Sequence, residues 1–69
     1  MNGFIELTSM MKDKMLVKIS DITLVTQVEG YKYALIRLHG SSTMVEVKHT
    51  YEEIKRLIEE NGVEEDDLK

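Results

Sequence analysis

The sequence contains no cysteine, no proline and no tryptophan among its 69 residues. Without cysteine the chain has neither disulfide cross-links nor thiolate metal ligands, which is typical of a reducing compartment, and we expect a cytoplasmic protein. Without proline every backbone N–H is free to enter a hydrogen-bonded ladder, so no residue opposes a strand. No apolar run approaches the roughly 20 residues needed to cross a bilayer, and the N-terminus lacks the pattern of a signal peptide. We therefore expect no membrane partner.

The short length limits the chain to one hydrophobic core and so to one domain. We expect this domain to cover residues 1–62, and we expect the acidic tail 63–69 to fray. A domain of this size buries only about 60% of its unfolded surface, so its stability margin is small. Since disulfides are absent, self-association is the remaining route to extra stability.

Charge is unevenly spread along the chain, whose net charge is −4. Residues 1–50 carry six bases and five acids, whereas residues 51–69 carry three bases and eight acids. A duplex-binding protein needs clustered Lys and Arg to neutralise phosphates, and no segment here has such a cluster. The sequence therefore argues against nucleic acid as a partner.

Alternating apolar residues and turn signals predict a mostly β (α+β) fold: an antiparallel meander of four to five strands, followed by one C-terminal amphipathic helix. The reversals are expected at Met11–Lys14, Ser20–Asp21, Glu29–Gly30 and His39–Ser42. The strands are predicted at residues 4–7, 15–19, 22–28, 31–38 and 43–48. The fourth is expected to be central, because it is apolar on both faces.

The helix is the best-defined element in the sequence. Thr50–Glu53 matches the capping box, in which a threonine and a glutamate satisfy two amides that have no helical partner. Gly62 follows as a stop residue that can take the left-handed conformation. The spacing of four apolar residues predicts a single buried face, made of Tyr51, Ile54, Leu57 and Ile58.

No residue pattern indicates catalysis, a cofactor or a metal. His39 and His49 are the only histidines, and neither has a metal-ligand spacing or a carboxylate at a motif distance. His39 precedes Gly40 in a predicted loop, and His49 is expected to pack on the start of the helix. None of the serines lies in a nucleophile elbow, and the acidic run at 64–67 lacks the pattern of a calcium loop. We expect a protein that is not an enzyme.

The apolar residues exceed what one helix on one sheet face can cover. Tyr31, Tyr33 and Leu35 share a face of the predicted fourth strand, and Met10 and Met11 lie in or beside a turn. These five residues form the candidate interaction surface. A second copy could cover the tyrosine face through a two-fold dimer, or the sheet could curl into a small closed barrel that buries it.

Three segments carry a resemblance to known families: VKISDI at 17–22, GYKYALI at 30–36 and VEVKHTYEEI at 45–54. Over nearly its whole length the chain resembles the short flagellar FlbD-like family and related small bacterial and phage proteins. It also resembles the first half of LytTR DNA-binding domains, but it ends before the strands and loop that carry much of their DNA contact. The first resemblance implies a small accessory or regulatory protein, and it implies no active-site residue.

The leading hypothesis is a small non-enzymatic interaction or regulatory module that binds a protein partner or a second copy of itself. Two alternatives stay open. One is an accessory protein associated with nucleic acid. The other is a subunit of an oligomeric small-molecule-binding protein or enzyme, since a 69-residue monomer has little room to enclose a pocket of about 300 Å³ or more.

Overall fold

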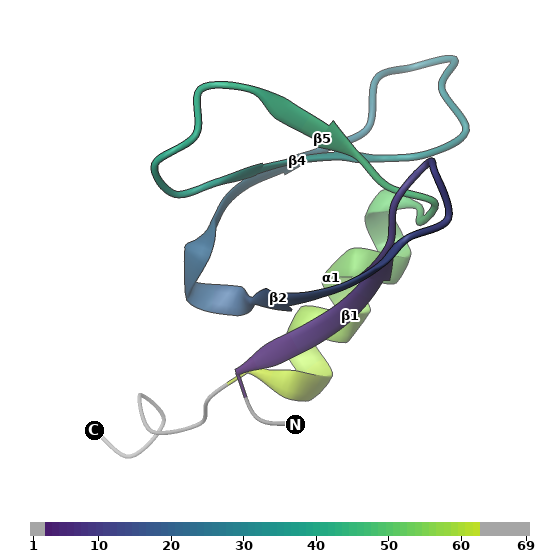
Figure 1. Ribbon diagram of the computed structural model, residues 1–69. Helices are drawn as coiled ribbons and strands as arrows, with labels where there is room; N and C mark the ends of the chain where they lie inside the picture. Colours follow the sequence, from purple (N-terminus) through teal and green to yellow (C-terminus); the bar gives the residue numbers. More distant parts are fainter. Residues whose placement is uncertain (1–2, 63–69) are drawn as a thin grey trace.

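A β-hairpin opens the computed structural model, which describes residues 3–62 (Figure 1). Strands β1 (Phe4–Thr8) and β2 (Lys14–Lys18) pair antiparallel, with Ile5 opposite Val17. Successive side chains on a strand point to opposite faces, so Ile5, Leu7 and Val17 are buried while Leu16 is exposed. The predicted strands at 4–7 and 15–19 are therefore confirmed to within one residue.

A second sheet contains β3 (Ile22–Thr26), β4 (Leu35–Leu38) and β5 (Met44–Glu46). The strands are ordered β3-β4-β5 and are all antiparallel, which confirms the central place of the fourth strand. This strand is shorter than predicted, because residues 31–34 are not part of it. The Gln27 amide donates to the carbonyls of Tyr31 and Lys32, and these bonds hold the segment in a bent path.

The predicted mostly β fold, with antiparallel strands and one C-terminal helix, is confirmed. The five strands of the described residues form two sheets, which are not closed into the small barrel that the sequence left open. A turn of 3-10 helix, η1 (Ile19–Asp21), lies between β2 and β3, at the predicted Ser20–Asp21 corner. It turns the chain away, so β3 pairs with β4 and not with β2. At the other end of the sheets, a bridge joins Ser9 to Val47, and Lys48 N donates to Thr8 O over 2.8 Å. The two sheets are thus connected at two separate points, the η1 turn between β2 and β3 and the bridge between Ser9 and Val47 (Figure 1).

Helix α1 (Tyr51–Asn61) begins at the predicted capping box. Thr50 Oγ1 accepts from Glu53 N over 3.2 Å, and Glu53 Oε1 accepts from Thr50 N over 3.0 Å. Ile54 is fully buried, and Leu57 and Ile58 pack against the core. Tyr51 departs from the predicted buried face, since 39% of its surface is exposed.

Gly62 ends the helix in a different way from the prediction. Its φ is −69°, so the left-handed conformation expected from the sequence is wrong. Glycine is needed here for space: a Cβ at this position would lie 2.9 Å from the carbonyl oxygen of Ile58. The carbonyl of Asn61 accepts from Gly3 N over 2.7 Å, which ties the end of the helix to the start of β1. The predicted acidic tail lies outside the described residues.

The core lies where the hairpin, the three-stranded sheet and the helix meet. Its buried side chains come from all three parts of the fold: Ile5, Leu7, Val17, Ala34, Ile36, Val47 and Ile54. The fully buried core of the described residues is small, because it contains only seven side chains and one of them is an alanine. The part of the chain that the structure describes has no helix long and apolar enough to cross a membrane.

Candidate functional site

Large apolar side chains are exposed in two places on the described surface. The first group, the hairpin patch, consists of Met10, Met11 and Leu16. The second group gathers around β3 and the start of α1 and consists of Leu24, Val28, Tyr31 and Tyr51. Apolar groups that cluster on a surface mark interaction sites more often than scattered ones do.

A groove runs between β3 and α1, and we call it the strand–helix groove. Its volume is about 430 Å³. Two elements contribute its lining, namely Thr23, Leu24 and Val25 from the strand and Tyr51, Lys55, Ile58 and Glu59 from the helix. β3 pairs with β4 along one edge, and among the described strands no other strand pairs with it. Such an edge offers unpaired backbone groups to an extended segment.

An irregularity in β3 turns Leu24 towards the groove. The pairing register between β3 and β4 shifts between Ile22 and Leu24. Ile22 and Val25 both pack against the core, although regular alternation would place them on opposite faces. The extra residue of a bulge allows this, and it leaves Leu24 41% exposed.

One stripe of the helix forms the opposite wall. Tyr51, Lys55, Ile58 and Glu59 are spaced four, three and one residues apart, which places them on one side of α1. Ile58 is half-buried, so it forms apolar floor. Lys55 and Glu59 bring one charge of each sign to the rim.

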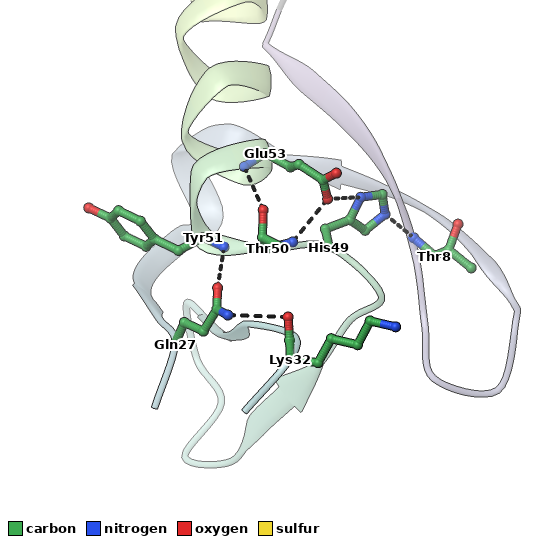
Figure 2. A network of polar contacts seen from close by, with 7 residues as sticks. All are labelled: Thr8, Gln27, Lys32, His49, Thr50, Tyr51 and Glu53. Carbon is green, nitrogen blue, oxygen red and sulfur yellow. Dashed lines mark hydrogen bonds and ion pairs between the residues drawn. The ribbon is translucent and has the colours of Figure 1, made fainter. Parts of the chain in front are cut away.

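Gln27 positions the helix start against the loop that follows β3 (Figure 2). Its Oε1 accepts from Tyr51 N over 2.7 Å, and its Nε2 donates to the carbonyls of Tyr31 at 3.0 Å and Lys32 at 3.2 Å. One amide side chain thus holds the backbone of Tyr31 and Tyr51 near the same point. The two exposed tyrosines therefore belong to one part of the surface.

His49 links β1 to the helix start (Figure 2). Thr8 N donates to its Nε2 over 3.0 Å, so that nitrogen acts as a hydrogen-bond acceptor. Nδ1 lies 3.8 Å from Glu53 Oε1, the oxygen that also accepts from Thr50 N. These contacts place His49 on the start of the helix, as expected. Its ring has a structural role, because it connects β1 to the helix start. His39 is exposed in the turn after β4.

A second hollow of about 450 Å³ lies between β1 and the other side of the helix. Its lining combines His49, Arg56 and Leu57 with three glutamates: Glu6, Glu53 and Glu60. Among the residues that the structure describes, no group of three His, Cys, Asp or Glu side chains could hold a metal ion.

The hairpin loop presents Met10 and Met11 on a tightly bonded backbone. Ser9 N donates to Asp13 O over 2.8 Å, and Lys12 N donates to Ser9 O over 2.9 Å. Ser9 Oγ accepts from the N–H groups of Met11 and Asp13, both at 3.1 Å. Lys12 takes a positive φ of 71°, in the left-handed region where a side chain is strained. Met11 is 84% exposed at the tip.

The candidate residues predicted from sequence lie in different places. Met10 and Met11 are exposed together on the hairpin loop, and Tyr31 is 56% exposed beside the groove. Tyr33 and Leu35 are half-buried, and Lys32 Nζ lies 5.5 Å from the centre of the Tyr33 ring. Because β4 begins at Leu35, the three residues do not form a common strand face.

Sequence reasoning missed four exposed apolar side chains, namely Leu16, Leu24, Val28 and Tyr51. Leu16 had a signal, since the alternation of a strand at 15–19 places Leu16 on the face opposite to Met15 and Val17. Leu24 had none, because the bulge depends on the pairing with β4.

Comparison of the chain with protein-family models, with curated proteins and with solved structures gave no match. The resemblances to the FlbD-like family and to LytTR domains therefore stay predictions.

Proposed function

We propose that the protein is a cytoplasmic, non-enzymatic interaction module that associates with a second copy of itself through the strand–helix groove. The observation that carries this proposal is the groove: an apolar channel between an unpaired strand edge and a helix face, with Leu24 and Tyr51 exposed along it. Grooves of this kind bind protein segments, because the strand edge supplies main-chain hydrogen bonds and the pockets supply selectivity.

Two features support a second copy as the occupant. The fully buried core is small, and a chain without disulfides has few other sources of stability. The charges of residues 3–62 nearly cancel, with eight bases against nine acids, so two copies repel each other only weakly through this part of the chain.

The test is the mass of the full-length protein in solution, measured by light scattering over a concentration series. We expect the wild type to exceed the mass of one chain as concentration rises. Leu24→Ser should weaken association by about tenfold or more, since it removes an apolar side chain from the groove.

Leu16→Ser is the matched control. Leu16 is more exposed than Leu24, at 60% against 41%, but it lies on the hairpin and outside the groove. It should associate like the wild type. A wild type that stays at one chain mass, or a Leu24→Ser protein that associates like the wild type, would overturn the proposal.

A further inference from the structure

We infer that the segment in the strand–helix groove is the Met10–Lys12 loop of a second copy, with Met11 seated between Leu24 and Ile58. This inference rests on the proposed function and names the part of the partner that the groove receives. None of the loop residues lines the groove of its own chain. The contact therefore joins two different surfaces of two copies.

The apolar character of the loop tip matches that of the groove lining. Met11 is the most exposed of the large apolar side chains in the described part of the chain, and it stands at the tip of a narrow hairpin loop. The groove lining includes four apolar or aromatic side chains, those of Leu24, Val25, Tyr51 and Ile58. A methionine is unbranched and adapts to irregular gaps, and its sulfur makes favourable contacts with an aromatic ring such as that of Tyr51.

The charges also complement each other. The loop carries Lys12 next to Asp13, and the groove rim carries Glu59 one helical turn after Lys55. Opposite charges thus stand side by side on both surfaces, in a spacing of similar size. With Met11 seated, Lys12 can lie near Glu59 while Asp13 lies near Lys55. This pairing selects one direction of the loop in the groove.

The loop is already ordered before it binds. Two hydrogen bonds to Ser9 Oγ and two between backbone groups hold residues 9–13. A segment held in its bound conformation loses less conformational entropy on association. The positive φ of Lys12 adds a second indication, because strained backbone is retained most often where a surface has a function.

A loop-to-groove contact can be made twice, reciprocally, in a two-fold dimer, or once per pair in a larger ring or an open chain. The contact also predicts complementation between two defective variants. Met11→Ser has a defective loop and an intact groove, whereas Leu24→Ser has a defective groove and an intact loop.

The experiment uses the full-length Met11→Ser and Leu24→Ser proteins, each alone and in an equimolar mixture, with light scattering and native mass spectrometry as readouts. We expect each variant alone to remain at one chain mass. The mixture should form dimers that contain one chain of each variant, and no larger species. Both side chains are exposed, and unchanged circular dichroism and melting curves would verify that both variants fold.

Other outcomes separate the inference from the proposed function. If Met11→Ser associates like the wild type while Leu24→Ser is monomeric, another segment occupies the groove; the inference is then wrong and the proposed function stands. A Leu24→Ser protein that associates like the wild type overturns both. A mixture in which both variants stay at one chain mass, although the wild type associates, overturns the inference.

Discussion

At the scale of single residues, backbone conformation and contacts with neighbours explain why particular residue types occur at particular positions. Lys12 is the only non-glycine residue with a positive φ among those the structure describes. Gly62 is needed because of the nearby Ile58 carbonyl and not because of its own φ. His49 accepts a hydrogen bond from Thr8 N, which connects β1 to the helix start. Each of these roles follows from a contact with a particular neighbour.

Replacing Lys12 with glycine should raise the free energy of unfolding by up to about 1 kcal/mol, because glycine takes a positive φ without a Cβ clash. Urea unfolding monitored by circular dichroism measures this change. The control is Lys14→Gly, two residues further on in β2, where the backbone is extended and glycine should destabilise by roughly 0.5–1 kcal/mol. Equal losses in both variants would mean that Lys12 is not strained.

At the scale of elements, the helix and the strands owe their stability to different sources. The helix begins at a local device, the capping box, in which Thr50 and Glu53 bond each other's backbone. The strands depend on partners that are distant in sequence, as in the pairing of β1 with β2 or the bridge from Ser9 to Val47. The groove exists because an edge strand and a helix face lie side by side.

Thr50→Ala should lower the free energy of unfolding by about 1 kcal/mol, since Glu53 N then loses its side-chain acceptor. Thr50→Ser keeps the hydroxyl and should retain most of the stability. Melting midpoints of the two variants measure the difference. If the alanine variant melts with the wild type, the helix does not depend on this cap.

Ile54→Ala should destabilise the protein by about 2–5 kcal/mol, because Ile54 is fully buried and the substitution leaves a cavity in a small core. Leu57→Ala should cost less, since Leu57 is only half-buried. The exposed Glu52→Ala is the control and should change little. Unfolding free energies in that order are expected, and similar values for Ile54→Ala and Glu52→Ala would contradict the assigned helix face.

At the scale of the whole molecule, a small core leaves apolar side chains on the surface in two separate places. The hairpin patch and the strand–helix groove come from different elements and do not overlap. Residues 3–62 carry nearly balanced charge, so apolar contact rather than net attraction should decide association. Loop-to-groove association would use the Met10–Lys12 loop of one copy and the strand–helix groove of another.

Self-association should therefore persist at high salt. Around 1 M salt the Debye length is about 3 Å, which screens exposed charges, and surface ion pairs contribute only about 0–1 kcal/mol. We expect the dissociation constant to rise by less than about fivefold between low and high salt, measured by sedimentation. Complete dissociation at high salt would indicate that charge, and not Met11 and Leu24, holds the copies together.

The amino-acid sequence by itself determined the features that depend on near neighbours. Alternation and turn signals predicted β1 and β2 to within one residue, the Thr50–Glu53 pair predicted the helix start, and Glu29–Gly30 predicted a reversal where Gly30 has a φ of 92°. Backbone propensity, capping and turn formation act over a few residues, so a short pattern is enough to predict them.

The tertiary structure alone decided the features that depend on distant partners. These include the division into two sheets, the bulge that exposes Leu24 and the shortening of the fourth strand by Gln27. Tyr51 shares the helical spacing of Ile54, yet it lies beyond the edge of the core, and the spacing gives no measure of how far the core extends. The groove is formed by residues about thirty positions apart in the chain, and only the packing of β3 beside α1 brings them together.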